Sequence, residues 1–308
     1  MDSSARIIRR KLDGVLLLDK PVGLSSTQAM AAAKRIFRAE KAGHTGTLDP
    51  FATGLLPVCF GEATKYSRFM LDAAKSYRAT LKLGEVSSTG DTEGIITASG
   101  IVEVDDDRVT KVLAQFLGPQ VQTPPMYSAL KQDGVPLYKL ARQGIEVKRE
   151  ARDITIFGIH LVSLDAALMV VDVDVSKGTY VRVLAEDIGR ALGCGAHLIG
   201  LRRTATGGFS VANAVELDRL RALSESDASQ LLLPAEALVT SLPVIRLAQS
   251  DATIFCNGGW VDFATDNPSA MEAAVWDEAG RFLGVGETVQ SGQTWRLTPG
   301  RLIATGKH

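Results

Sequence analysis

One carboxylate in this chain is held by a sequence that fixes the backbone around it. Asp49 precedes Pro50 in the segment GHTGTLDPFATG, which runs from residue 43 to residue 54. Proline disfavours helix at the residue before it, and the glycines of this segment permit backbone conformations that are closed to other residues. A loop fixed in this way commonly carries function, so Asp49 is the first candidate for a catalytic group. The alternative is that Asp-Pro flanked by glycines forms an ordinary turn.

The sequence around Asp49 resembles a known family. GHTGTLDPFATGLLPVCFGEATK, preceded by GVLLLDKPVGLSS, is similar to the signature of the TruB family of tRNA pseudouridine-55 synthases. Further segments similar to that family follow in order: KSYR at 75–78, STGDTEG at 88–94, PPMYSALK at 124–131, LYKLAR at 137–142, SKGTYVR at 176–182 and AHLIGLRR at 196–203. The resemblance covers about residue 14 to about residue 215. A chance match of this length and order is very improbable, although each piece alone is weak evidence.

The resemblance implies a reaction that needs no cofactor. One uridine of tRNA becomes pseudouridine when the N1 glycosidic bond breaks, the uracil turns, and the bond reforms through C5. Neither a redox step nor a group carrier is required. The resemblance designates Asp49 as the catalytic nucleophile and Arg182 as its partner. The guanidinium suits a bidentate contact with a carboxylate, and such pairing is expected to keep Asp49 ionised and to lower its pKa.

The resemblance also implies which residues hold the substrate. The target base is stacked in folded tRNA, so it must be extruded before Asp49 can reach its sugar. His44 would brace the space that the nucleotide leaves. Tyr77 would stack on the flipped uracil and take part in proton transfer from C5. Tyr180, Leu201 and Lys20 complete the predicted substrate-binding set, with Lys20 as a structural or phosphate contact. Each of these side chains could instead be a packing residue.

The pattern of apolar residues predicts the elements that position this set. We expect a buried strand over 14–19, then a helix capped by Ser25 or Ser26 with its apolar face at Met30, Ala33, Ile36 and Phe37. Residues 62–72 are helical in pattern, and strict alternation over 76–83 places Tyr77 on the inner face of a strand. The remaining predicted elements are a helix capped by Asp106 or Asp107 with Val109, Val112, Leu113, Phe116 and Leu117 on its apolar face, a strand over 171–175, and a helix from about Tyr180.

The order of these elements favours a mixed α+β fold without regular βαβ alternation. With the resemblance, this predicts a largely antiparallel sheet of the pseudouridine synthase type over residues 1–240. After a helix-like segment at 228–238, residues 241–308 show short apolar stretches separated by turn residues, as a small β-barrel would. Residues 244–247, the turn at 256–259 and residues 282–287 resemble the RNA-binding PUA domain. This PUA-like unit has five basic and seven acidic side chains, which weakens the case for a positive RNA surface there.

Composition restricts the remaining possibilities. The 308 residues carry a formal net charge of −1, although residues 1–41 hold nine basic and four acidic side chains. That cluster is either an RNA footprint or a solvated helix face. Three scattered cysteines and four histidines without ligand spacing predict no disulfide framework and no metal. No apolar run is long enough for a membrane helix, and the N-terminus lacks the apolar segment of a secretory signal, so we expect a cytoplasmic location. We also expect a monomer.

Three other functions fit parts of the pattern. A non-catalytic RNA-binding protein could use the same scaffold, but it has no need to hold Asp49, Arg182 and Tyr77 together. A glycoside hydrolase usually needs two carboxylates, and only Asp91 and Glu93 are near in sequence. A pseudouridine synthase could also act on another RNA or through guiding proteins. The N-terminal motifs and the lack of long basic tails favour a stand-alone enzyme that binds the T stem-loop of tRNA, with no obligatory protein partner.

Overall fold

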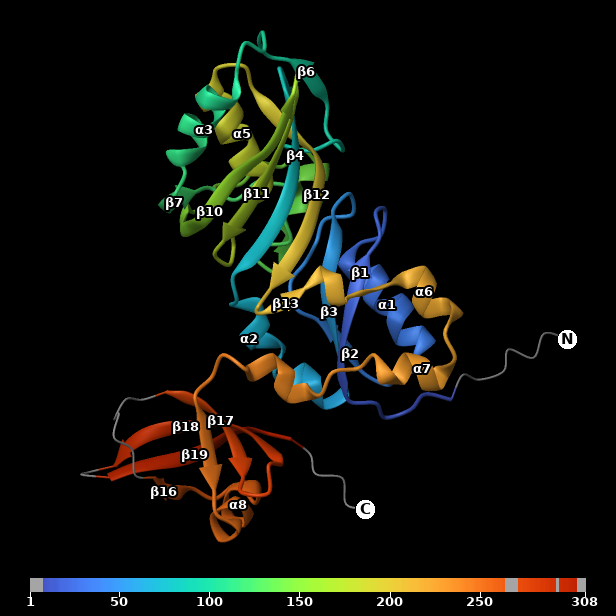
Figure 1. Cartoon of the computed structure of the whole chain (residues 1–308), viewed down its shortest axis with the longest axis vertical. Coiled ribbons are helices and arrows are strands. Elements are labelled where there is room, and N and C mark those ends of the chain that lie inside the picture. Colours follow the sequence, from blue (N-terminus) through green and yellow to red (C-terminus); the bar gives the residue numbers. More distant parts are fainter. Residues whose placement is uncertain (1–7, 264–270, 292–293, 304–308) are drawn as a thin grey trace, which may run out of the picture.

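The computed structural model describes residues 8–263, 271–291 and 294–303, which form a large mixed sheet and a smaller C-terminal sheet (Figure 1). The large sheet has ten strands. Along its main path these are β14 (Val215–Glu216), β1 (Gly14–Lys20), β3 (Thr53–Phe60), β12 (Ala196–Thr206), β4 (Lys75–Leu83), β11 (Leu168–Val175), β10 (Arg152–Asp165) and β7 (Gly118–Gln122). β13 (Phe209–Ser210) pairs with β12, and β2 (Ala42–His44) pairs with β3. Only the β1–β14 and β3–β12 pairs are parallel, which confirms the predicted mixed, largely antiparallel sheet.

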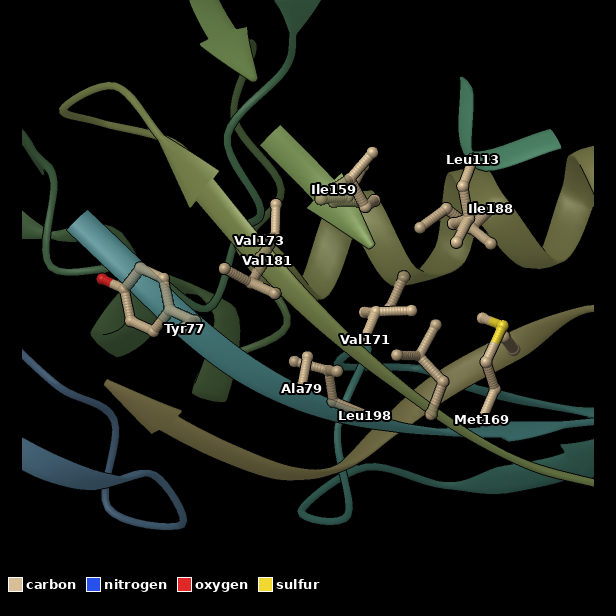
Figure 2. Close-up of a cluster of buried hydrophobic side chains, with 14 of the residues drawn as sticks. Tyr77, Ala79, Leu113, Ile159, Met169, Val171, Val173, Val181, Ile188 and Leu198 are labelled. Carbon is tan, nitrogen blue, oxygen red and sulfur yellow. The ribbon is translucent and has the colours of Figure 1, made fainter. Parts of the chain in front are cut away.

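One face of the sheet is covered by α3 (Asp106–Ala114) and α5 (Val181–Leu192), whose apolar sides pack on β4, β10, β11 and β12. The alternation predicted for β4 is confirmed, because every second residue from Lys75 to Leu83 is buried. Figure 2 shows the resulting cluster, with Tyr77 at one end of it and its hydroxyl directed away from the other labelled side chains. The ring of Tyr77 is therefore part of the core, and its hydroxyl points out of the core.

The sheet half that holds β1 and β3 packs on α1 (Ser26–Ile36). Ser25, one of the two serines predicted as the cap, caps this helix, and it does so in a capping box with Gln28. The buried apolar side chains of the helix and its C-cap are Ala29, Ala33 and Phe37, four residues apart, whereas Met30 and Ile36 are only partly buried. The short elements η1 (Gly61–Lys65) and α2 (Ser67–Leu71) follow β3. They divide the helical segment predicted over 62–72 into two pieces.

The remaining elements connect these parts. Two small hairpins are formed by β5 (Glu85–Ser87) with β6 (Ile96–Ala98) and by β8 (Lys131–Gln132) with β9 (Val135–Pro136), and α4 (Leu137–Arg142) follows β9 directly. After β13 the chain runs through η2 (Val211–Asn213) and β14 to α6 (Leu217–Ala222), α7 (Glu225–Gln230) and η3 (Ala235–Val239).

The second sheet comprises β15 (Val244–Leu247), β17 (Glu272–Asp277), β18 (Phe282–Ser291), β19 (Thr294–Leu302) and β16 (Val261–Phe263), in that spatial order. This five-stranded half-barrel agrees with the small β unit expected from the sequence. It also contains α8 (Gln249–Cys256), a helix that the short apolar stretches did not predict. The unit is packed on η1, α2 and η3, where Tyr66 and Met70 meet Phe282 and Val285 in one apolar cluster.

Three details differ from the sequence-based expectations. Asp105, not Asp106 or Asp107, caps α3, because its carboxylate accepts the backbone N–H of Arg108. α3 then ends at Ala114, which leaves Leu117 49% exposed instead of on the apolar face. The helix-like segment 228–238 is split between α7 and η3, since Pro234 precedes η3 and supplies no N–H to continue α7.

Some charges counted in the sequence lie outside the described residues. These are Asp2 and Arg6 of the basic N-terminal segment and Asp266 and Lys307 of the C-terminal unit. Within the described ranges, none of the helices combines the length and apolar character needed to cross a membrane.

Replacing Gly54 with alanine is expected to destabilise the protein by about 3 kcal/mol or more. Gly54 has a φ of +102°, and a Cβ there would lie 2.3 Å from the carbonyl oxygen of Arg203 on the neighbouring strand β12. The left-handed conformation alone costs about 1–2 kcal/mol, and the clash would force β3 away from β12. The change in Tm measured by calorimetry tests this expectation.

Gly208→Ala is the matched control for this experiment. Gly208 also has a positive φ of +85°, but a Cβ there would meet no atom within 4 Å. Its substitution therefore reports the backbone cost without the clash. Equal losses of Tm in the two variants would show that the contact between β3 and β12 does not constrain Gly54.

Candidate active site

The loop that carries Asp49 is anchored from beneath by α1. The hydroxyl of Ser26 donates to the carbonyl of Leu48 at 3.0 Å and accepts the N–H of the same residue at 2.7 Å. Ser26 is buried, so both bonds lie away from water. On the other side of Asp49, the N–H of Gly23 donates to the carbonyl of Pro50 at 2.8 Å. The backbone on either side of Asp49 is therefore fixed, as the proline and glycines of the sequence predicted.

Lys20 is a second anchor of the same loop. It is fully buried, and its Nζ donates to the carbonyls of Pro21 at 2.9 Å, Leu24 at 2.6 Å and Pro50 at 3.4 Å. Burial lowers the pKa of Lys20 to about 8, the charge of Asp49 opposes that shift, and Arg203 adds to it. The structure thus places Lys20 under the loop with its ammonium directed at backbone carbonyls. A buried ammonium in this position has no surface to offer an RNA phosphate.

Asp49 and Arg182 meet in the structure. Nε of Arg182 lies 3.1 Å from Oδ2 of Asp49, in an ion pair between the loop and the first turn of α5. The Arg182 side chain is 5% exposed, whereas that of Asp49 is 36% exposed. The carboxylate therefore faces the open side of the pair and the guanidinium lies behind it.

The guanidinium of Arg182 is shared among several acceptors. Its Nη1 lies 3.2 Å from Oδ2 of the buried Asp91 and donates to the carbonyl of Thr89 at 3.1 Å, while Nη2 donates to the carbonyl of Tyr127 at 2.7 Å. The structure shows one contact of Arg182 with Asp49, through Nε, instead of the expected bidentate contact. The sequence did not predict the role of Asp91, which lies in the STGDTEG segment.

The net pKa shift of Asp49 is upward, contrary to the expectation from pairing alone. Burial raises the pKa of Asp49, Arg182 and Lys20 lower it, and the like charge of Asp91 raises it. Burial is the largest of these effects, and the attraction of Arg182 does not offset it. Asp49 is thus a carboxylate whose charged form is held at a cost in free energy.

A cleft of about 790 Å³ opens above the pair. Asp49, Arg182, Tyr77, Tyr180 and Leu201 all line it, so five of the predicted site residues are brought together. Tyr180 is the N-cap residue of α5, and its backbone N–H and C=O are both bound by the side chain of Gln122. Its ring also lies 5.7 Å from the guanidinium of Arg152, another lining residue. Leu201 lies on β12, opposite Ala79 of β4.

His44 is not among the residues that line this cleft. It is the last residue of β2, is half-buried, and pairs with Val58 of β3. Burial and the charge of Arg203 lower the pKa of His44, while its contact with the Gly46 backbone raises it. Its ring is therefore neutral at neutral pH, five residues before Asp49 in the same loop segment.

Two buried cations beside the cleft were missed by sequence reasoning. Arg203 is 1% exposed, and it donates to the carbonyls of Leu55 at 2.7 Å and Gly46 at 3.3 Å. Lys75 donates to the carbonyls of Leu71 and Ala73, and burial lowers its pKa to about 8. The AHLIGLRR and KSYR segments contain these residues, but only their backbone partners, distant in sequence for Arg203 and nearby for Lys75, identify them as supports of the cleft walls.

Comparison with protein families accounts for nearly the whole chain. Residues 34–181 match the TruB family pseudouridylate synthase N-terminal domain, residues 182–240 match the tRNA pseudouridylate synthase B C-terminal domain, and residues 243–303 match the C-terminal domain of pseudouridine synthase II TruB. A tRNA pseudouridine synthase B of Dechloromonas aromatica (strain RCB) is 50% identical over 96% of this chain and 96% of its own. One from Burkholderia mallei (strain ATCC 23344) is 49% identical over 98% and 97%.

The chain belongs to the TruB family of pseudouridine synthases.

Solved structures support the same assignment for the fold of this TruB family member. The archaeal box H/ACA sRNP Nop10–Cbf5 complex contains a chain that matches with a TM-score of 0.72 and 26% identity, over 94% of this chain and 85% of that one. A chain of a Cbf5–Nop10–Gar1 complex matches with a TM-score of 0.70 and 27% identity, over 91% and 79%. The fold is thus that of the pseudouridine synthases.

The geometry also bears on the hydrolase alternative. A glycosidase needs a second carboxyl group that can reach the scissile bond or a water beside it. Asp91 is only 2% exposed, and its Oδ1 accepts from the hydroxyl of Thr89 at 2.6 Å and the N–H of Glu93 at 3.0 Å. Asp91 is therefore engaged with the protein and with Arg182, and it is not a free acid in the cleft.

Asp49→Asn is expected to raise Tm at neutral pH. Because the pKa of Asp49 is raised on folding, ionisation above the unfolded value of about 3.9 weakens the folded state until the pH exceeds the raised value. The amide removes this cost, and Arg182 keeps its contacts with Asp91 and two carbonyls. The gain in Tm should therefore be larger at pH 7 than at pH 4, as measured by thermal unfolding at both values.

The exposed Asp174 on β11 provides the control, because Asp174→Asn removes the same charge from solvent. Its substitution should leave Tm within about 1 °C of the parent at both pH values. A lower Tm for the Asp49 variant at pH 7 than for the parent would contradict the raised pKa.

Proposed function

We propose that this chain converts uridine to pseudouridine at position 55, in the T loop of tRNA, and that it does so as a stand-alone enzyme. The observation that carries the proposal is the partly exposed Asp49 carboxylate beside the buried Arg182 guanidinium at 3.1 Å, in a cleft also lined by Tyr77. Relatives of the TruB family that are about 50% identical to it bear the name tRNA pseudouridine synthase B. The product is an isomer of the substrate, so the proposed reaction needs neither cofactor nor metal.

The substrate nucleotide must leave the T-loop stack to reach Asp49. A cleft of about 790 Å³ with an aromatic wall suits one flipped nucleotide. We assign Tyr77 to stacking on the uracil, since its ring is held in the core of the sheet and its hydroxyl is directed out of it. Tyr180 and Leu201 form further parts of the wall, and His44 braces the RNA at the side of the loop, outside the cleft lining.

Asp49 carries the chemistry in this proposal. It attacks the ribose C1′, adds to uracil C6 or removes a ribose proton, and each of these routes requires the ionised carboxylate. Arg182 holds that charge in place while Asp91 fixes the guanidinium from the other side. Lys20 acts from below, through the carbonyl of Pro50, as a structural contact.

A protein that only binds RNA would gain nothing from this arrangement. Asp49 places a negative charge where phosphates must pass, and its raised pKa marks a cost to stability. Phosphate contacts rest on cations, so a pure binder would be improved by losing the carboxylate. The intact set of Asp49, Arg182 and Tyr77 in one cleft thus favours catalysis.

The RNA footprint is proposed to include a basic cleft on α1. A cleft of about 940 Å³ is lined by Ile8, Arg9, Ala31, Lys34, Arg35, Arg38, Ala39 and Glu40. Arg38 pairs with Glu225, whereas Arg9, Lys34 and Arg35 form no ion pair with any described residue. Cations without internal partners are available to phosphates. This cleft supports the RNA-footprint interpretation of the basic N-terminal segment.

The domain division, location and partners complete the proposal. We assign residues 1–240 to the catalytic domain and 241–308 to a PUA-like RNA-binding domain. The tRNA T stem-loop is the partner, the chain is a cytoplasmic monomer, and it needs no guide RNA or protein. The structural neighbours of this TruB member come from complexes with other proteins, so this last point distinguishes the chain from them.

Asp49→Asn is expected to lower pseudouridine formation by at least about 1,000-fold and to leave tRNA binding within a few fold. Tritium release from tRNA labelled at uracil C5 measures turnover, and filter binding measures affinity. The assay uses the purified chain and an unmodified tRNA transcript, without guide RNA or partner protein. Mapping the modified nucleotide in the same samples tests position 55.

Asp174→Asn again serves as the control, since that carboxylate is exposed on β11 away from the Asp49 loop. It should keep the parental rate. Substantial turnover by the Asp49 variant would remove Asp49 from the mechanism, and a parental enzyme that needs an added guide RNA would contradict the stand-alone assignment.

Replacing Arg9, Lys34 and Arg35 by glutamine in one triple variant is expected to lower the affinity for tRNA. It should also make that affinity less dependent on salt concentration. Each lost phosphate contact reduces the slope of log K against log salt by about 0.9, so the triple variant should lose about 2–3 units of slope. Lys111→Gln on the exposed side of α3 is the control, with no expected change. An unchanged slope in the triple variant would place the RNA elsewhere.

A further inference from the structure

Ser128 presents an unused polar group inside the active-site cleft. It is 4% exposed and is one of the residues that line the cleft with Asp49 and Tyr77. Its Oγ is buried and has no hydrogen-bond partner among the described residues. Buried hydroxyls normally have a partner, because an unpaired one costs about 1–3 kcal/mol. An unpaired hydroxyl on a residue that lines a substrate cleft calls for a ligand.

The backbone on both sides of Ser128 is held tightly. The carbonyl of Tyr127 accepts from Nη2 of Arg182 at 2.7 Å, and the carbonyl of Ser128 itself accepts the N–H of Tyr138 at 3.1 Å. The N–H of Ser128 donates to the carbonyl of Met126 at 2.9 Å. The guanidinium that holds Asp49 thus also fixes the residue next to Ser128. This arrangement gives the free hydroxyl a defined position relative to the catalytic pair.

We propose that Ser128 donates a hydrogen bond from Oγ to a carbonyl oxygen of the flipped uracil, as a substrate-binding residue of the reaction. This inference rests on the proposed function. Thr47, Ser176 and Thr179 also line the cleft, but among these hydroxyl side chains only that of Ser128 is both buried and without a hydrogen-bond partner among the described residues. A neutral hydroxyl is suited to a neutral carbonyl of a base. Charged groups are suited instead to the phosphates and to the ionised Asp49.

The symmetry of uracil makes one such donor useful throughout the reaction. Its two carbonyls lie on either side of N3, and a half-turn about the N3–C6 axis exchanges N1 with C5 and one carbonyl with the other. A hydroxyl at a fixed position therefore meets a carbonyl oxygen both before the turn and after it. Ser128 would retain the detached base in either orientation without a change in the protein.

Ser128→Ala tests the proposal, because its effects on stability and on activity should be opposite. Loss of an unpaired buried hydroxyl should leave Tm unchanged or higher, since no protein bond is broken. By contrast, kcat/KM for the tRNA transcript should fall about 3- to 10-fold, the worth of one hydrogen bond. Thr206→Val is the matched control, because Thr206 also has a buried, unpaired hydroxyl among the described residues but does not line the cleft. It should keep the parental kcat/KM.

Substrates with sulfur in place of one carbonyl oxygen identify the partner of Ser128. Sulfur is a weaker acceptor, so with 2-thiouridine or 4-thiouridine at the target position the loss caused by Ser128→Ala should shrink to below about 2-fold for at least one of them. An unchanged kcat/KM in Ser128→Ala, or the same loss on uridine and on both thio substrates, would overturn the assignment to a uracil carbonyl. Failure of the parental enzyme to form pseudouridine would instead refute the proposed function itself.

Discussion

The active site depends on one guanidinium that is buried and shared. Arg182 contacts Asp49 from the loop before β3, Asp91 from the segment after β5, and the carbonyl of Tyr127 from the segment after β7. A buried cation must be matched by acceptors, or its desolvation is not offset. These contacts tie three segments that are distant in sequence to the first turn of α5. Removal of Arg182 would leave Asp91 as a buried charge without a cationic partner. Arg182 therefore supports the fold as well as the proposed catalytic carboxylate Asp49.

The loop of Asp49 is rigid for a related reason. Ser26 and Lys20 form hydrogen bonds with the backbone of the loop, and both side chains are buried. The carboxylate is therefore presented by a surface that does not need to reorganise when RNA binds. A preorganised charge of this kind is effective because folding has already oriented the carboxylate, so the reaction does not require its reorganisation. The same rigidity explains why Gly54, at the start of β3, tolerates no side chain against the backbone of Arg203.

Local patterns predicted the parts of this site that depend on local sequence. The N-cap of α1 at Ser25 or Ser26, the alternation of β4 that turns Tyr77 inward, and the start of α5 beside Tyr180 all follow from neighbouring residues. The resemblance to the family then predicted that Asp49 and Arg182 are partners. The role of Asp91 could not be predicted, because it depends on a contact between two residues that are 91 positions apart in the sequence. Asp91 lies between β5 and β6, and its partner Arg182 lies on α5. The expected lowering of the Asp49 pKa was wrong mainly because burial raises that pKa, and the nearby carboxylate of Asp91 raises it further.

The cleft concentrates features that stability alone would remove. Asp49 has a raised pKa, and the hydroxyl of Ser128 is buried without a partner among the described residues. Each feature opposes folding, and each would be relieved by a single conservative substitution. Proteins retain such costs mainly where function requires them. Both lie in the one cleft that also holds Tyr77 and Arg182. A substrate that supplies an electrophilic sugar to the carboxylate and a carbonyl to the hydroxyl would offset both costs at once, and a flipped uridine has both groups.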